Sequence, residues 1–237
     1  IEEAEFLVKH CKVPFLKIAS MELNNYFFLE QLAKLQVPLI LSTGMGSFDE
    51  IKSAVELLKE HCVKDLIILH CTSIYPSKPE IINLKNIIML KKSFLTCPIG
   101  FSDHSEGTSV PIAATALGAC VIEKHFTLDK KQIGMDNGMA SEPSEFRSMT
   151  KSCIIAYKSL GNEYRSLTQE ELEMATKMRR SVVCKKDLQP NELITEEKIE
   201  FKRPGTGISV DKFQDVIGKR LNKKKVKGDL IHKFDIC

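Results

Sequence analysis

Pro98-Ile-Gly-Phe-Ser-Asp-His104 and Cys120-Val-Ile-Glu-Lys-His125 are two similar segments, each an apolar run that ends in a histidine. The apolar residues predict two buried β-strands, and Ser105 to Leu117 between them predicts a helix. A strand, a helix and a second strand in this order form one repeat of a parallel sheet. We therefore expect His104 and His125 at the carboxyl ends of neighbouring strands, side by side on one rim.

Three more apolar segments precede this pair: Pro14 to Ser20, Pro38 to Thr43 and Asp65 to Cys71. Their hydrophobic runs are nearly continuous, which is typical of parallel strands that are buried on both faces. Helical patterns accompany the strands at Asn24 to Leu35, after the capping box Ser47-Phe-Asp-Glu50, and at Ser141 to Leu160. This alternation predicts an α/β fold of five βα units.

Polar side chains, such as Ser42 and Thr43, stand at the end of every predicted strand. A (β/α)8 barrel collects its functional groups there, so the pattern favours a TIM barrel over an open sheet. We expect about three βα units of the barrel to be missing ahead of Ile1, with residues 1–165 forming its C-terminal part. Short strands and turns follow, which predict a linker helix at 166–176 and a small, irregular β domain at 177–237.

The composition is that of a soluble globular protein, with 43% hydrophobic and 27% charged residues among 237. A net charge of +3 argues against a nucleic-acid partner, and no apolar run is long enough to place the chain in a membrane. The eight cysteines include no C-x-x-C pair, and most stand in apolar surroundings. We expect reduced, core-filling thiols in a cytoplasmic protein.

His104 and His125 are candidate metal ligands. A lone histidine at a strand end is more often a buried, hydrogen-bonded residue, but two at matching positions favour a metal site. Each stands near a carboxylate, Asp103 or Glu123, that can orient a metal-bound imidazole. Ser102 shares a strand face with His104, as Glu123 does with His125. Two imidazoles with open positions for water or substrate oxygen suit Mn²⁺ or a similar octahedral ion.

Lys17 interrupts an otherwise apolar strand. A buried ammonium group is costly without a partner, so this lysine indicates a phosphate or carboxylate ligand. The hydroxyls of Ser20, Ser42 and Ser102 would add donors at three strand ends, although such serines also cap helices. Glu22 fits a helix start as well as it fits a carboxylate that faces the pocket.

Six segments together resemble the sialic acid synthase family, whose members use phosphoenolpyruvate to make nonulosonic acids. They follow the family's order along nearly the whole chain: Lys17-Ile-Ala-Ser-Met-Glu22-Leu-Asn-Asn25, Leu41-Ser-Thr-Gly-Met45, His70-Cys-Thr-Ser-Ile-Tyr-Pro76, Ile99-Gly-Phe-Ser-Asp-His104, Glu123-Lys-His-Phe-Thr127 and Lys202-Arg-Pro-Gly205. Each segment alone is weak evidence, whereas all six in order are specific. The small domain is likewise similar to the antifreeze-like (SAF) domain that ends these enzymes.

The resemblance implies a metal-dependent transferase. Phosphoenolpyruvate adds through C3 to the aldehyde of an open-chain N-acylated hexosamine, such as N-acetylmannosamine. Water attacks C2, the C–O bond breaks, and phosphate leaves. By this likeness His104 and His125 would hold Mn²⁺ or Mg²⁺, which polarises the aldehyde oxygen.

The resemblance also implies a role for each remaining site residue. Glu22 and Asp136 would handle the sugar hydroxyls or the attacking water, and Glu123 would sit beside the metal. Arg203 would reach the N-acyl group from a partner subunit, because the family forms domain-swapped homodimers. Phosphoenolpyruvate would be bound by Lys17, Ser20, Ser42 and Ser102, with Ser73 as a further contact.

Two departures from the family pattern affect these expectations. Ser73 stands where several bacterial members have asparagine, which weakens its assignment to phosphoenolpyruvate. The first three barrel strands, which give the family's site a glutamate and another lysine, are missing from this chain. We therefore expect the chain alone to be inactive and the intact gene product to be active.

Other readings of the sequence stay open. The segment Ile133-Gly-Met-Asp-Asn-Gly-Met-Ala-Ser-Glu142 differs from sialic acid members and favours a bacterial 6-deoxy sugar. A legionaminic or pseudaminic acid synthase, or a spore-coat polysaccharide synthase, is therefore the alternative within the family. A non-catalytic sugar- or ice-binding module is an alternative of another class, against which the polar rim argues. A heptulosonate or octulosonate synthase is disfavoured by the C-terminal domain.

Overall fold

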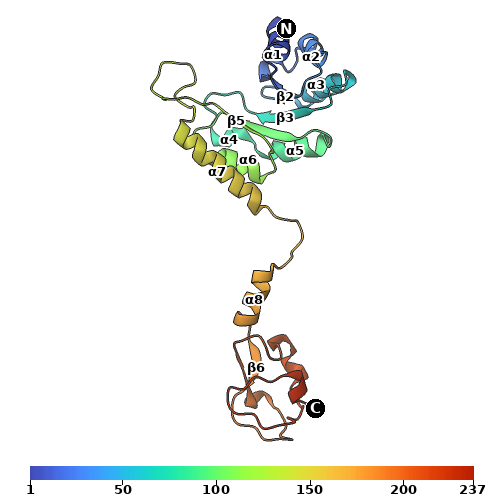
Figure 1. Cartoon of the computed structure of the whole chain (residues 1–237), viewed down its shortest axis with the longest axis vertical. Coiled ribbons are helices and arrows are strands. Elements are labelled where there is room, and N and C mark those ends of the chain that lie inside the picture. Colours follow the sequence, from blue (N-terminus) through green and yellow to red (C-terminus); the bar gives the residue numbers. More distant parts are fainter. The chain divides into compact units, whose positions relative to one another are not determined.

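Five parallel strands form the sheet of the first of two units, Ile1–Gly161, in a computed structural model that describes all 237 residues. The strands pair in chain order (Figure 1). They are β1 (Leu16–Ile18), β2 (Leu39–Ser42), β3 (Leu66–Cys71), β4 (Ile99–Asp103) and β5 (Ile122–Lys124). All five lie within the predicted segments, so the continuous apolar runs correctly indicate a parallel sheet.

The helices of this unit are α1 (Glu2–Lys9), α2 (Tyr26–Ala33), α3 (Phe48–Glu60), α4 (Pro79–Ile82), α5 (Lys85–Ser93), α6 (Ser109–Ala116) and α7 (Pro143–Ser159). The predicted capping box of Ser47 and Glu50 opens α3. The helix expected from Ser105 begins later, at Ser109. Sequence reasoning missed α4 and α5, because Asn83 adopts a left-handed conformation with φ of 52° and divides their apolar pattern into short pieces.

The hydrophobic core of the first unit lies between one face of the sheet and the helices. Alternate strand residues point into it, and Leu39 and Leu41 of β2 are fully buried there. Leu29 of α2, Leu58 of α3 and Leu90 of α5 belong to the same cluster. The helices therefore cover this face of the sheet.

The sheet curls around its second face, and one ion pair spans the curl. Lys17 Nζ of β1 lies 3.5 Å from Glu123 Oε1 of β5, although these are the two edge strands. In a flat sheet, four steps between neighbouring strands would place the edges about 19 Å apart. The first unit is thus a half-barrel of five βα units, which is the part of the predicted barrel that the structure shows.

Two expectations from the apolar pattern are wrong. Burial on both faces fails at the edges of the sheet, where β1 alternates between buried and exposed residues and β5 is half-buried. An edge strand has a neighbour on one side only, so water reaches its other side. The eight cysteines are free thiols, as expected, but half of them are exposed instead of filling the core: Cys11, Cys62, Cys120 and Cys237.

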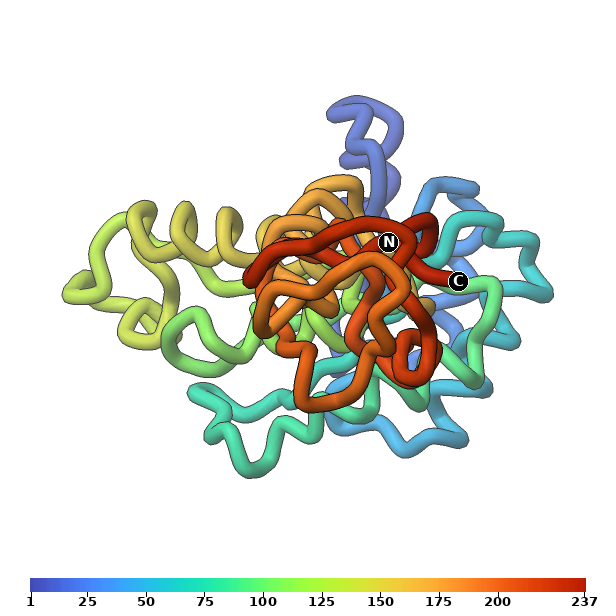
Figure 2. The backbone as a smooth tube through the Cα atoms, turned by 90° about the horizontal axis from the view of Figure 1, so that it is seen from below, coloured from blue at the N-terminus to red at the C-terminus, as the bar shows by residue number.

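The second unit, Asn162–Cys237, consists of short elements. They are α8 (Gln169–Met178), the antiparallel pair β6 (Ser181–Cys184) and β7 (Ile199–Lys202), and the 3₁₀ helices η2 (Glu196–Lys198), η3 (Val210–Asp215) and η4 (Lys233–Asp235). Loops and isolated bridges make up most of the remainder (orange to red in Figure 2). Val182, Leu188 and Ile231 anchor its own core. None of the helices in either unit has the length and apolar character needed to cross a membrane.

Within the second unit, Asp235 forms ion pairs with two lysines and so holds the C-terminal residues against the rest of the unit. Its side chain is fully buried, with Oδ2 2.7 Å from Lys225 Nζ and Oδ1 2.9 Å from Lys223 Nζ. Burial raises the pKa of Asp235, but the bonds from Lys225 and Lys223 outweigh burial and hold this pKa below its usual range. The carboxylate therefore stays charged in the folded protein.

Candidate functional site

The second face of the curled sheet has an apolar end and a polar end. At the amino ends of the strands, Pro14, Ile40 and Ile67 help to line an apolar groove of about 640 Å³. At the carboxyl ends, the same face carries hydroxyl, thiol, carboxylate and imidazole groups. Barrel enzymes place their chemistry at the carboxyl ends of their strands, so this polar rim is the candidate site.

His104 and His125 lie side by side on the rim, as their spacing predicts. Their ring centroids are 5.3 Å apart and the ring planes meet at 66°. His104 is buried, whereas the His125 side chain is 34% exposed. Tyr75 packs against both, with its ring centroid 4.2 Å from that of His104 and 5.7 Å from that of His125. The tyrosine ring thus packs along one side of the histidine pair.

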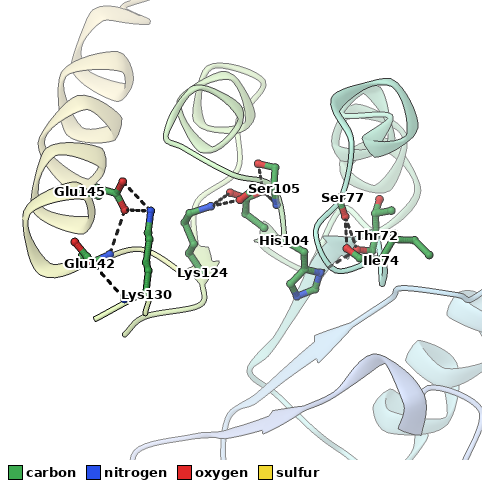
Figure 3. A network of polar contacts seen from close by, with 10 residues as sticks. Thr72, Ile74, Ser77, His104, Ser105, Lys124, Lys130, Glu142 and Glu145 are labelled. Atoms are coloured by element: carbon green, nitrogen blue, oxygen red, sulfur yellow. Dashed lines mark hydrogen bonds and ion pairs between the residues drawn. The ribbon is translucent and has the colours of Figure 1, made fainter. Parts of the chain in front are cut away.

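The backbone fixes the orientation of the His104 imidazole (Figure 3). His104 Nδ1 lies 2.9 Å from Thr72 O, so Nδ1 carries the proton and the lone pair remains on Nε2. Ser77 supports this arrangement, because its N–H donates to His104 O at 2.8 Å and its hydroxyl donates to Thr72 O at 3.1 Å. A carbonyl that holds one ring N–H is the usual support of a metal-bound histidine.

Asp103 does not orient a histidine, contrary to the expectation from sequence. Its carboxylate accepts hydrogen bonds from Lys124 Nζ at 2.6 Å and from Ser105 Oγ at 2.7 Å. Side chains alternate along a strand, so Asp103 points to the face opposite Ser102 and His104. The carboxylate on the rim is that of the next strand, described below.

The two imidazoles differ in their affinity for a proton. Burial lowers the pKa of His104, but its contacts with Cys71 and Thr72 outweigh burial and hold this pKa above its usual range. Burial and the neighbouring His104 together lower the pKa of His125. His125 is thus the more readily available lone-pair donor, and a cation at His104 competes with a proton.

Lys17 occupies an exposed position of an edge strand, which corrects the interpretation that it is buried. Its Nζ donates to Ile18 O at 3.1 Å and lies 3.5 Å from Glu123 Oε1. The same Glu123 oxygen accepts from Ser102 Oγ at 2.6 Å. Glu123 therefore joins β1, β4 and β5 across the hollow of the half-barrel, and it keeps the ammonium group directed into that hollow.

Ser20, Cys71 and Ser73 surround Gly44 next to the histidines. Ser20, the first residue of η1 (Ser20–Glu22), accepts from Gly44 N at 3.0 Å and donates to Cys71 Sγ at 3.4 Å. Ser73 Oγ lies 3.7 Å from the same sulfur. A Cβ atom at Gly44 would lie 2.8 Å from Ser20 Oγ and would also overlap Ser73 Oγ. The absence of a side chain at Gly44 thus leaves room for these hydroxyls.

Ser42, the last residue of β2, has a buried hydroxyl oxygen without a hydrogen-bond partner. An unpaired buried hydroxyl costs about 1–3 kcal/mol, so such groups are rare in folded proteins. A ligand oxygen at the rim would supply the missing partner.

Of the remaining predicted residues, Asp136 lies beside His125 and Glu22 is hydrogen-bonded to Asn25, whereas Arg203 belongs to the other unit. Asp136 Oδ2, on the loop between β5 and α7, lies 3.8 Å from His125 Nδ1. Glu22 accepts a hydrogen bond from Asn25 Nδ2 at 2.6 Å, which ties it to the start of α2. Arg203 belongs to the second unit, where it follows β7.

Sequence reasoning missed Cys71 and Tyr75, which both contact His104. Burial raises the pKa of the Cys71 thiol, but hydrogen bonds with His104 and Ser20 outweigh it and lower this pKa. Burial raises the pKa of Tyr75. Strand alternation could have identified Cys71 as a rim residue. Cys71 pairs in register with Ser102 and shares its face of the sheet. The position of Tyr75 depends on a loop conformation that alternation does not predict.

His104 and His125 could together hold a divalent cation. In neutral His104 the lone pair lies on Nε2, because Nδ1 donates to Thr72 O, and the lowered pKa of His125 keeps that ring readily neutral. No third histidine, cysteine or carboxylate completes a preformed cluster with them, so water or ligand oxygens would fill the other positions. Mn²⁺ and Mg²⁺ accept such mixed, oxygen-rich sets. With an ammonium group and hydroxyls nearby, the rim suits an anionic ligand that shares a cation with the protein.

Comparisons with known proteins identify the family of this chain. The NeuB family model matches residues 1–165, and the SAF domain model matches residues 179–236. An N,N'-diacetyllegionaminic acid synthase of Campylobacter jejuni is 36% identical over 97% of this chain and 69% of its own length. A pseudaminic acid synthase of the same species is 37% identical, over 99% and 67%. A crystal structure of N-acetylneuraminic acid synthetase from Leptospira borgpetersenii, in complex with citrate, has a TM-score of 0.67 and 37% identity, over 71% of this chain and 58% of that one.

This chain spans about two thirds of the length of those two curated relatives. The family match covers the half-barrel with all of its rim, and the domain match covers most of the second unit. The resemblance to sialic acid synthases that the six segments indicate is thereby confirmed. The chain belongs to the NeuB family, and a SAF domain follows its family-specific part.

Proposed function

We propose that this chain provides the metal- and phosphoenolpyruvate-binding part of a nonulosonic acid synthase. The observation that carries the proposal is the convergence of two imidazoles, the Lys17 ammonium group and the unpaired Ser42 hydroxyl on one rim. A phosphorylated enol and an aldehyde need such groups, namely cations and hydrogen-bond donors for the phosphate and a Lewis acid for the carbonyl. The names of the relatives, as legionaminic, pseudaminic and sialic acid synthases, support the same class of reaction.

In the proposed reaction, C3 of phosphoenolpyruvate forms a bond with the aldehyde carbon of an open-chain N-acylated hexosamine. Water adds at C2, the C–O bond to the phosphoryl group breaks, and phosphate leaves. Mn²⁺ or Mg²⁺ held by His104 and His125 would act as a Lewis acid for the aldehyde oxygen. Thr72 O keeps the proton of His104 on Nδ1 throughout, so Nε2 stays available as a ligand atom.

The anion would be bound by the groups around the hollow of the half-barrel. Lys17 would exchange its ion pair with Glu123 for one with the phosphate or carboxylate, and Ser42 would gain its missing partner. Ser20, Ser73 and Ser102 would supply further hydroxyl donors to phosphoenolpyruvate. Glu123, once released by Lys17, would sit beside the cation.

The acceptor would be held from the loops and from a second subunit. We assign Asp136 and Glu22 to the sugar hydroxyls or the attacking water, and Arg203 of a domain-swapped homodimer to the N-acyl group. The relatives differ in the sugar acid that they are named for, and the segment Ile133–Glu142 favours a bacterial 6-deoxy sugar. We further propose that the chain binds its ligands without turnover, and that a form extended to the length of its relatives turns over.

Phosphate release tests this proposal. The extended form would be incubated with phosphoenolpyruvate, Mn²⁺ and either N-acetylmannosamine or a bacillosamine-derived hexose, and free phosphate would be measured with time. We expect release that depends on both the metal and one acceptor, and no release by the His104→Ala variant. Failure of every acceptor to promote phosphate release would show that the proposed function is wrong.

The replacement Gly44→Ala is expected to weaken phosphoenolpyruvate binding by roughly tenfold or more, as for the loss of a hydrogen bond to a charged ligand. The new Cβ would displace Ser20 Oγ and Ser73 Oγ. Gly138→Ala is the matched control, because its Cβ would meet nothing within 4 Å. Isothermal titration with phosphoenolpyruvate would compare the two variants with the parent chain. Equal affinities for all three proteins would contradict the assignment of Ser20 and Ser73 to phosphoenolpyruvate binding.

A further inference from the structure

Asp103 and Lys124, which immediately precede His104 and His125 in the chain, form a buried ion pair, and Figure 3 shows Lys124 beside Ser105. Lys124 Nζ lies 2.6 Å from Asp103 Oδ2, and the two side chains are 1% and 0% exposed. Ser105 closes the arrangement: its N–H and its hydroxyl donate to Asp103 Oδ1 at 2.9 and 2.7 Å, and its carbonyl accepts from Lys124 Nζ at 2.6 Å. Both charges are therefore matched by short hydrogen bonds within one closed ring.

This pair is the last direct link between the two segments that carry the histidines. Asp103 and Lys124 are partners at the final position of the β4–β5 ladder, and His104 and His125 are the next residue on each chain. Beyond that point the backbones separate. His104 O accepts from Ser77 N, whereas His125 O accepts from Ser141 N. No ladder bond fixes the distance between the histidines themselves.

A contribution to stability alone is a poor explanation for such a pair. The desolvation of two buried charges often cancels their attraction, and apolar residues of similar size often stabilise a protein equally well. What a buried pair with matched hydrogen bonds does supply is a fixed geometry between the two elements that it joins. Here those elements are the two strand ends that present imidazoles to one point.

We propose that the Asp103–Lys124 ion pair, closed by Ser105, is a positioning clamp that sets the spacing of His104 and His125 for a divalent cation. This inference rests on the proposed metal-binding function of the histidines. The clamp residues themselves face the helices, on the opposite side of the sheet from the cation, and act through their chain neighbours. Groups that support metal ligands in this way typically change metal affinity by ~10–100-fold when they are replaced.

The test compares Mn²⁺ binding with folding in the same variants. Asp103→Asn combined with Lys124→Met removes both charges, so neither is left unpaired. Its folded fraction would be measured by circular dichroism and its Mn²⁺ affinity by isothermal titration. We expect a folded protein whose Mn²⁺ affinity is about tenfold weaker. Ser105→Ala, which keeps both charges, is expected to fold and to weaken Mn²⁺ binding about threefold. If the double variant does not fold, the Mn²⁺ affinity of the Ser105→Ala variant tests the clamp by itself.

Lys225→Met is the matched control, because it also breaks a buried lysine–aspartate pair, but in the second unit. It is expected to leave Mn²⁺ affinity unchanged. If the parent chain binds Mn²⁺ and the folded clamp variants bind it equally well, the clamp is overturned while the proposed function stands. If the parent chain binds no Mn²⁺, the proposed function itself fails.

Discussion

Replacement of His104 or His125 by alanine is expected to abolish specific Mn²⁺ binding to this chain. Each variant leaves a single imidazole at the rim, and no preformed cluster of three or more histidine, cysteine or carboxylate groups is present to hold the cation instead. The loss should exceed the ~10–100-fold that is typical of residues that only support a ligand. Electron paramagnetic resonance of free Mn²⁺, titrated with each protein, measures the bound fraction directly.

His61→Ala is the control for this experiment. His61 caps the C-terminal end of α3, where its Nδ1 lies 3.0 Å from Leu57 O and its Nε2 lies 3.7 Å from Glu30. Its replacement should leave Mn²⁺ binding unchanged. Equal loss of binding in all three variants would indicate nonspecific histidine binding, and no loss in the His104 and His125 variants would exclude the histidine pair as the metal site.

Asp235→Ala is expected to destabilise the second unit by about 3–5 kcal/mol, because it leaves the mostly buried Lys225 ammonium group without its partner. Hydrogen exchange of the β6 amides, followed by mass spectrometry, reports the free energy of opening of this unit. Lys202→Ala, which removes an exposed ion pair with Glu200, should change it by only about 0–1 kcal/mol. Similar exchange rates for the Asp235→Ala variant and the parent would show that Asp235 does not stabilise the second unit.

The lowered pKa of Asp235 predicts that the second unit loses stability in acid. Its pKa is lowered by folding, so its contribution to stability is fully present above the pKa of an unfolded aspartate, about 3.9. That contribution is lost as the pH falls from there through the lower pKa of folded Asp235. The Asp235→Ala variant should therefore lose less stability than the parent over this acidic range.

The parallel sheet and the histidine pair could be predicted because both depend on local patterns. An apolar run between two helices indicates a strand wherever it occurs, and the carboxyl ends of parallel strands meet at one edge. The same alternation that places Ser102 and His104 on the rim places Asp103 on the other face, so its true direction was also readable from the sequence. Asp103 is next to His104 in the chain, but its position in the strand directs its side chain to the other face.

The contacts that depend on curvature could not be predicted in this way. Lys17 and Glu123 meet because the sheet curls, and no local pattern gives the degree of curl. Tyr75 meets both histidines because its loop folds back over the rim. The apolar segment around Lys17 suggested a buried ammonium group, but an edge strand leaves that position open to water. In each case the three-dimensional arrangement of strands and loops determines the contacts of the residue, and the residue type alone does not.

We propose that the histidine pair and the anion-binding groups form one site that holds a cation and phosphoenolpyruvate together. The ³¹P relaxation rate of phosphoenolpyruvate, measured with this chain and Mn²⁺, tests it directly, because a paramagnetic ion speeds relaxation only of nuclei close to it. We expect strong enhancement with the parent chain and its loss with His104→Ala, although that variant keeps Lys17 and the rim serines. Equal ³¹P relaxation with the two proteins would show that His104 does not hold a cation next to bound phosphoenolpyruvate.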